Sequence, residues 1–283
     1  MSGGHRSECP DCCGRTASPP TLATLGLGCC ERVRQQGIYC AARPVYAVCR
    51  GGGGSSAFLL NVQDTKERRG YDEDWLKDKY PRVYGYLLKF QKMLRQRSGF
   101  KKYFCKEVGK GAKKRLEPFA PFYSLYNIGE YTLAPYKVCW PELSNDLRVG
   151  VTELSKDAKS KNEILIPDHT VVFIPLENRE EAHYCSAVLN SSIAGLIVAS
   201  YVTLHPSPHI LENIRLSKFD TKNQQHRRLA ELSKAAHALA AESEPDVKRL
   251  EAIEFEIDEA AAKLWDISAA ELSEIKFSLA DLQ

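Results

Sequence analysis

The sequence has little that suits a membrane-bound or secreted protein. Its longest apolar run, residues 193–202, is interrupted by Gly195 and Ser200, and it is far short of the ~20 residues that a transmembrane helix needs. The first residues do not form a charged region followed by an apolar stretch, as a secretory signal would. We therefore expect a cytoplasmic protein without membrane contact, in which the ten cysteines need not form disulfides.

The sequence also lacks the spacing of common catalytic and metal sites. Gly109 and Gly111 precede two lysines, but the GxxxxGK[ST] spacing of a phosphate-binding loop is missing. The residues His183, His205 and His209 are not spaced as metal ligands, so we predict that they are surface or core histidines. No Ser/His/Asp or Cys/His set has a spacing that indicates nucleophilic catalysis.

A nuclease centre is an alternative. Glu153 with Asp157 and Lys159 contains the residue types of a carboxylate-plus-DxK metal site. The segment is rich in lysine and has the composition of a loop, so intrinsic cleavage is not expected.

Charge is present in quantity, but it is unevenly distributed. The formal net charge is only +3, yet residues 82–115 contain twelve Lys or Arg and a single acid, Glu107. Residues 242–281 contain twelve acids and only four Lys or Arg. One part of the chain therefore attracts polyanions, while the other repels them.

The basic segment begins with a predicted helix. Residue 81 is a proline, which suits the first turn of a helix because its missing N–H has no partner there. Apolar residues then recur at intervals of four, three and four along one helical face: Val83, Leu87, Phe90 and Leu94. We predict one amphipathic helix with a basic outer face, which ends near Gly99, and then an exposed loop around Gly109 and Gly111.

The composition of the basic segment favours contact with nucleic acid. Tyr103, Phe104, Tyr123 and Tyr126 are interleaved with or follow the cations, and ring faces beside a cationic surface suit DNA. Phosphate contacts would supply affinity and register, not sequence choice. The side chains expected to make them are Lys89, Lys92, Arg95, Arg97, Lys101, Lys102, Lys113, Lys114 and Arg115.

A β-rich segment follows the basic one. Short runs of β-type residues alternate with turns at residues 131–140, 147–154, 164–166 and 170–175, and prolines keep these strands short or at sheet edges. Such a module presents loops on a rigid frame and suits the reading of base edges. The predicted functional side chains are Tyr131, Tyr136, Lys137 and Trp140, although at least half of the rings in such a strand should pack in the core.

The last 60 residues have the pattern of a helical hairpin and one short helix. Apolar stripes at residues 229–239 and 250–264 are joined by a turn at residues 242–245, so the two helices should pack antiparallel. Ser268 and Glu271 form a capping box that begins the last helix. Because this part is acidic, DNA contact is unfavourable, and we expect a spacer or a docking surface.

The tract at residues 121–140, PFYSLYNIGEYTLAPYKVCW, resembles a segment in the C-terminal target-recognition half of adenine-specific DNA methyltransferases. This TaqI-like class includes the type IIG restriction-modification enzymes. Residues 187–192, 209–214 and 218–220 resemble the same family, and the likeness covers about residues 57–283. Together with the patterns above, it implies an α+β fold: a small β-rich DNA-recognition module flanked by helices, with a C-terminal helical hairpin. The expected domains are residues 57–220, for target recognition, and 221–283.

The family's catalytic motifs are missing from the sequence. An adenine-N6 methyltransferase needs a glycine-rich turn for S-adenosylmethionine and an Asn/Asp-Pro-Pro-aromatic loop, and the sequence contains neither. We expect a chain that is inactive alone, binds no cofactor itself and recognises double-stranded DNA, while a separate catalytic domain or subunit holds S-adenosylmethionine. Two alternatives remain open: a stand-alone specificity subunit that docks through residues 221–283, and a degenerate remnant without function.

Residues 1–56 differ in composition from the rest of the chain. They contain seven of the ten cysteines and show no sustained helical or strand period, so we predict that they are unstructured. Cys9 and Cys12 have the CxxC spacing of a zinc site, but the spacing is not repeated. A third interpretation is a mistranslated upstream frame, because the family likeness begins abruptly near residue 57.

Overall fold

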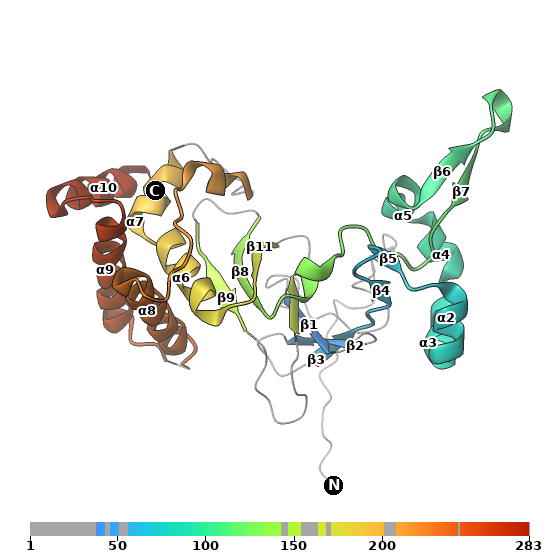
Figure 1. Cartoon of the computed structure of the whole chain (residues 1–283), viewed down its shortest axis with the longest axis horizontal. Coiled ribbons are helices and arrows are strands. Elements are labelled where there is room, and N and C mark those ends of the chain that lie inside the picture. Colours follow the sequence, from blue (N-terminus) through green and yellow to red (C-terminus); the bar gives the residue numbers. More distant parts are fainter. Residues whose placement is uncertain are drawn as a thin grey trace, which may run out of the picture.

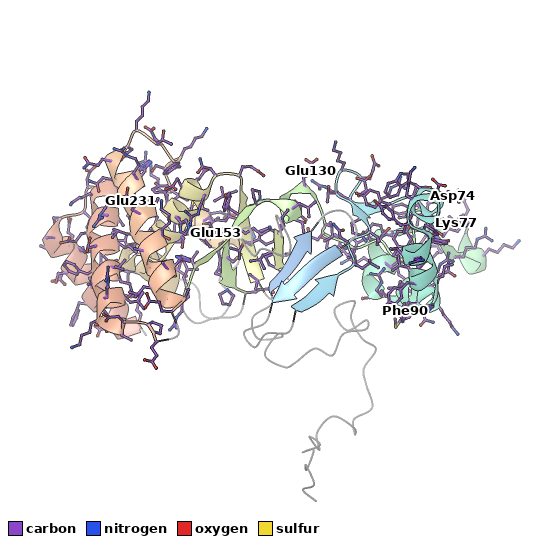
Figure 2. All side chains as sticks on the ribbon, turned by 90° about the horizontal axis from the view of Figure 1, so that it is seen from below. Asp74, Lys77, Phe90, Glu130, Glu153 and Glu231 are labelled. Carbon is purple, nitrogen blue, oxygen red and sulfur yellow. The ribbon has the colours of Figure 1, made fainter. Side chains whose placement is uncertain are left out.

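The computed structural model describes residues 38–42, 46–50, 56–142, 147–153, 164–167, 171–200, 208–242 and 244–282. The chain is elongated: a helical lobe lies at one end, small sheets lie in the middle, and short helices with a protruding hairpin form the other end (Figure 1). Figure 2 shows Glu231 in the helical lobe and Asp74 and Lys77 at the opposite end. The predicted α+β fold, with small sheets and C-terminal helices, is confirmed.

The end with the protruding hairpin, which we call the basic end, is built from four short helices. They are α2 (Glu73–Lys79), α3 (Pro81–Leu88), α4 (Gln91–Gln96) and α5 (Ser98–Tyr103). The single helix predicted from Pro81 to about Gly99 is wrong, because the chain leaves the helix at residues 89–90. This break allows the short helices to turn around one small core, in which Leu87, Leu94 and Phe100 are all buried.

Two small hairpins complete the basic end. β4 (Gln63–Asp64) pairs with β5 (Arg69–Gly70), and β6 (Cys105–Val108) pairs with β7 (Arg115–Pro118), all antiparallel. The predicted exposed loop around Gly109 and Gly111 is the tip of the β6–β7 hairpin, and it contains the short helix η3 (Gly111–Lys113). Gly109 has a φ of 97°, a left-handed value that glycine adopts without strain.

The middle of the molecule contains a three-stranded antiparallel sheet. β8 (Tyr136–Pro141) lies between β11 (Val171–Leu176) and β9 (Gly150–Thr152), with Val138 opposite Ile174 on one side and Val151 on the other. The strand predicted from residue 131 begins only at residue 136, because η4 (Glu130–Leu133) comes first. Two helices follow the sheet, α6 (Arg179–Leu189) and α7 (Ser192–Ala199).

A second sheet uses part of the chain that was predicted to be unstructured. Its strands are β1 (Ile38–Ala42), β2 (Tyr46–Arg50), β3 (Ser56–Leu59) and β10 (Ile164–Pro167), in the order β10-β1-β2-β3. The prediction for residues 1–56 is therefore wrong at β1 and β2: β1 pairs with the distant β10, and β2 pairs with β1 and β3. Cys9 and Cys12, the zinc alternative, lie outside the described residues.

The helical lobe agrees with the sequence. After η5 (Pro208–Asn213) come α8 (Gln224–Ala240), α9 (Val247–Leu264) and α10 (Ala269–Leu282). The predicted capping box is confirmed: the Ser268 N–H donates to Glu271 Oε2 at 2.8 Å, and the Glu271 N–H donates to Ser268 Oγ at 3.3 Å. One hydrophobic core extends from Val138 to Leu272, so these helices pack on the same core as the β8 sheet. The domain boundary at residue 220 stays a prediction.

Among the described residues, no single helix has the length and apolar character to cross a membrane; α6 and α7 meet that standard only as a pair bent by 60°.

Candidate nucleic-acid interface

The basic end exposes most of the cations that the sequence singles out. Eight of the nine predicted phosphate-contacting side chains are exposed in the described structure. They lie along three features: the α3–α4 junction with α4, the helix α5, and the tip of the β6–β7 hairpin. These residues are Lys89, Lys92, Arg95, Lys101, Lys102, Lys113, Lys114 and Arg115. The hairpin tip protrudes from the rest of the fold (Figure 1).

Few of these cations are neutralised within the protein. Lys114 Nζ lies 3.0 Å from Glu107 Oε2, and Arg115 Nη2 lies 2.6 Å from Glu117 Oε1. In the part of the chain that the structure describes, these two are the only ion pairs with carboxylates among the twelve Lys and Arg of residues 82–115. Exposed pairs of this kind are weak, so the surface keeps its attraction for polyanions.

Arg97 is the exception among the nine, because it serves the fold. Its Nε donates to the Leu94 carbonyl at 2.9 Å, and its Nη2 donates to the carbonyls of Phe122 and Ser124, both at 3.0 Å. Burial lowers the pKa of Arg97 to about 10. We therefore correct its assignment: the guanidinium binds the backbone of the aromatic tract. Sequence pattern alone does not distinguish the role of Arg97 from that of the exposed Arg95, two residues earlier.

The aromatic tract, here residues 121–126, is also held by Gln63. The buried Gln63 side chain donates from Nε2 to the Tyr123 carbonyl at 2.9 Å and accepts from the Leu125 N–H at 2.8 Å. The Gly70 N–H donates to Ser124 Oγ at 2.9 Å, and a Cβ at Gly70 would lie 2.6 Å from the Tyr123 ring. The close approach requires glycine. These contacts fix the course of the backbone as it leaves the core.

The four aromatic residues that accompany the cations divide into two kinds. Phe104 and Tyr123 are buried in the small core of the basic end. Tyr103 and Tyr126 lie at the surface and stack face to face, with ring centroids 3.6 Å apart and planes inclined by 9°. Lys102 Nζ is 5.0 Å from the centre of the Tyr103 ring. A hydrogen bond with Lys102 lowers the pKa of Tyr103, and a hydrogen bond with Tyr103 raises the pKa of Tyr126.

The structure does not support two of the four residues predicted in the β-rich segment. Lys137 and Trp140 are each only 1% exposed, and Lys137 Nζ donates to the Ala134 carbonyl at 2.7 Å. The prediction that these two side chains contact DNA is wrong, because β8 is a central strand that is buried on both faces. Tyr131 and Tyr136 are half-buried, and their contact with DNA stays a prediction. Tyr131 OH donates to the Asn127 side chain at 2.8 Å.

Glu153, the residue considered for a nuclease, is engaged in a structural network. Its Oε1 lies 2.9 Å from Arg179 Nε and 2.8 Å from His183 Nε2. Burial raises the pKa of Glu153, but hydrogen bonds with Arg179 and His183 outweigh it, so the net shift is downward. His183 is buried, as predicted for a core histidine. No group of three or more potential metal ligands occurs in the described residues; Asp157, Lys159 and His205 lie outside them.

A shallow pocket on the basic end was not predicted. It has a volume of about 370 Å³ and is lined by Arg69, Arg95, Asp72, Glu73 and Phe119, among others. Because its lining is contributed by segments far apart in the sequence, no local spacing could have indicated it.

Comparison with known proteins gives a partial match. No protein-family model matches the chain. Over 138 residues the chain is 28% identical to the Type II methyltransferase M.NspV of Nostoc sp. (strain ATCC 29411 / PCC 7524). The match covers 49% of this chain and 25% of that protein, so it spans about a quarter of the relative's length. About half of the chain is thus similar to a Type II methyltransferase.

Proposed function

We propose that this chain is the sequence-specific DNA-recognition part of an adenine-N6 DNA methyltransferase of a restriction-modification system. The observation that carries the proposal is the basic end, where eight exposed cations lie along the α3–α4 junction, α4, α5 and the β6–β7 hairpin. The similarity to a Type II methyltransferase supports DNA as the polyanion. It agrees with the likeness of residues 121–140 to target-recognition regions.

In this proposal, the lysines and arginines bind phosphates and release the counterions condensed on the duplex. The protruding hairpin extends this surface away from the core, so that α4 and the hairpin tip contact the backbone at separate places. These contacts set register, and half-buried residues at the start of the β8 sheet, Tyr131 and Tyr136, are the candidates for reading bases.

Methyl transfer is assigned to a catalytic domain or subunit outside this sequence. That partner would hold S-adenosylmethionine and the Asn/Asp-Pro-Pro-aromatic loop, which this sequence lacks. Residues 221–283 are the candidates for contact with it. Their helices share one core with the β8 sheet, so a partner docked there would be held at a fixed position relative to the sheet.

DNA binding is tested with the full chain and fluorescently labelled duplexes by anisotropy from 50 to 200 mM salt. We expect log Kd to rise with log salt with a slope of about 5, for about six phosphate contacts. An affinity that does not change with salt would contradict the proposal. Selection from a random duplex pool then tests specificity: an enriched motif is expected, and a pool without enrichment would reduce the function to non-specific binding.

The recognition-only role is tested separately. The full chain is incubated with DNA and S-adenosylmethionine, and N6-methyladenine is measured by mass spectrometry. We expect no methylated base above background. Methylation by this chain alone would show that the catalytic step does not need a partner.

A further inference from the structure

The stacked pair Tyr103 and Tyr126, here called the tyrosine stack, is unusual for its position. Its rings are nearly parallel at a centroid distance of 3.6 Å, yet Tyr126 is 55% exposed. Large aromatic rings normally contribute to the stability of a protein by burying their faces. This pair instead leaves ring surface in contact with solvent, beside the cation Lys102.

Both partners of the stack are held in place by the fold. Tyr103 ends α5, between the buried residues Phe100 and Phe104. Tyr126 follows Leu125, whose N–H is bound by Gln63, and Ser124, whose carbonyl is bound by Arg97. The stack is therefore preorganised, so a ligand need not pay the entropic cost of ordering it.

Two other exposed aromatic residues of the basic end, Tyr86 and Trp75, differ from the tyrosine stack. Tyr86 is 41% exposed but packs edge-on against Phe90, with ring planes inclined by 64°. Trp75, also exposed, packs against Tyr71 and Tyr80 in tilted arrangements. Among the described aromatic pairs, the tyrosine stack has the shortest ring distance. It also has an ammonium group 5.0 Å from one ring centre.

We propose that the tyrosine stack binds an unpaired DNA base, which stacks on the outer face of Tyr126 while Lys101 and Lys102 bind the adjoining phosphates. One face of each ring is already occupied by the other ring, and Tyr126 has the more exposed outer face. In a regular duplex both faces of an internal base are covered by its neighbours, so only a base that has left the stack can offer a face to tyrosine. This inference rests on the proposed DNA-binding function. It adds the kind of DNA structure that the chain recognises, namely a base outside the helical stack.

The experiment compares two DNAs with the full chain: a matched duplex and the same duplex with one unpaired 2-aminopurine at its centre. Stacking of one base on an aromatic ring contributes about tenfold to affinity. We expect the wild-type protein to bind the second DNA about tenfold more tightly. We also expect the 2-aminopurine fluorescence to fall on binding.

Substitutions test the role of the ring itself. Tyr126→Ala should abolish the preference and the fluorescence change, while affinity for the matched duplex and its salt dependence stay unchanged. Tyr126→Phe and Tyr126→Trp should retain the preference, because a ring face remains. Tyr86→Ala removes an exposed tyrosine of similar size from α3 and should change neither DNA interaction. Circular dichroism confirms that each variant is folded.

The outcomes separate this inference from the proposed function. Equal binding of the two DNAs by the wild-type protein, with a steep salt dependence, overturns the tyrosine stack as a base-binding site and leaves duplex binding intact. A preference that survives in Tyr126→Ala overturns it as well. Absence of binding to either DNA at low salt contradicts both proposals.

Discussion

The basic end and the helical lobe of this protein are stabilised in different ways. Among the described residues, the helical lobe and the β8 sheet share one core of 23 buried apolar residues, whereas eight form the core of the basic end. In the basic end, the Gln63 and Arg97 side chains bind backbone atoms of residues 122–125. Long helices with regular apolar stripes gain stability from burial. Short elements bury less, and specific polar contacts then decide how the chain is arranged.

The charges follow the same division. In the basic end, residues 82–115 contain twelve Lys or Arg and one acid, whereas residues 242–281 of the helical lobe contain twelve acids and four Lys or Arg. If DNA binding depends on this division, equal charge changes at the two ends must have very different effects on DNA affinity.

The largest expected effect is on DNA affinity. The triple variant Lys89→Glu, Lys92→Glu, Arg95→Glu should weaken duplex binding by about 1000-fold at 50 mM salt and reduce the log–log salt slope by about 3, since three phosphate contacts are lost. The matched control is Lys248→Glu, Arg249→Glu, Lys263→Glu on α9, which changes the net charge equally. Anisotropy titrations measure both. Equal losses in the two variants would show that only the net charge matters.

The next effect concerns the stability of the helical lobe. Buried Asp258 accepts hydrogen bonds from the Ser192 N–H and Oγ, both at 2.7 Å, and lies 2.9 Å from Lys276 Nζ. Asp258→Ala should lower the free energy of unfolding by about 3 kcal/mol, because it leaves these donors without their acceptor. Urea unfolding measures the change. Glu259→Ala, at the exposed neighbouring position, should cost less than about 0.5 kcal/mol.

A smaller loss is expected at the basic end from Arg97→Lys. A lysine keeps the charge but cannot make the three carbonyl contacts of the guanidinium, so the variant should lose about 1–2 kcal/mol of stability. Arg95→Lys is the matched control at an exposed position and should leave the free energy of unfolding almost unchanged. If the two variants unfold at the same urea concentration, the aromatic tract does not depend on Arg97.

The acid stability of the lobe should depend on His183. Burial lowers the pKa of His183 below 6.5, although Glu153 opposes the shift. The folded imidazole therefore resists a proton that the unfolded one accepts, so stability is present above pH 6.5 and declines as the pH falls below it. The pKa of Glu153 is lowered below 4.5, so protonation of this carboxylate adds a further loss of stability as the pH falls below 4.5.

Thermal unfolding between pH 7.5 and pH 5 measures this decline. His183→Gln should flatten the dependence of Tm on pH, whatever its cost to stability at pH 7.5. His209→Gln removes an exposed imidazole and is the control. A wild-type Tm that is constant over this range would contradict the assignment to His183.

The smallest effect is expected for Glu107→Gln on β6. The Glu107–Lys114 pair is exposed, so its loss should change the free energy of unfolding by less than about 0.5 kcal/mol. DNA affinity should rise slightly, because a repelling carboxylate is removed and Lys114 becomes available for phosphate. A clear loss of DNA affinity would mean that the pair orients the hairpin tip.

Much of the fold follows from pattern along the chain. The long helices α8 and α9 have regular apolar stripes, and the box formed by Ser268 and Glu271 marks the start of α10 because its two hydrogen bonds involve residues three apart. Charge segregation is likewise a property of the sequence alone. The strands β1 and β2 were missed because β1 pairs with β10, more than a hundred residues later in the chain, and β2 in turn pairs with β1 and β3.

The roles of single side chains at the candidate site depend on the tertiary structure. Periodicity and charge along the chain were enough to predict the helical lobe and the basic and acidic ends, because both are local quantities. The tertiary structure decided that Arg97, Lys137 and Trp140 serve the fold, since their partners or burial come from other segments. It also brought Tyr103 and Tyr126 into one stack at the surface, which no spacing along the chain specifies.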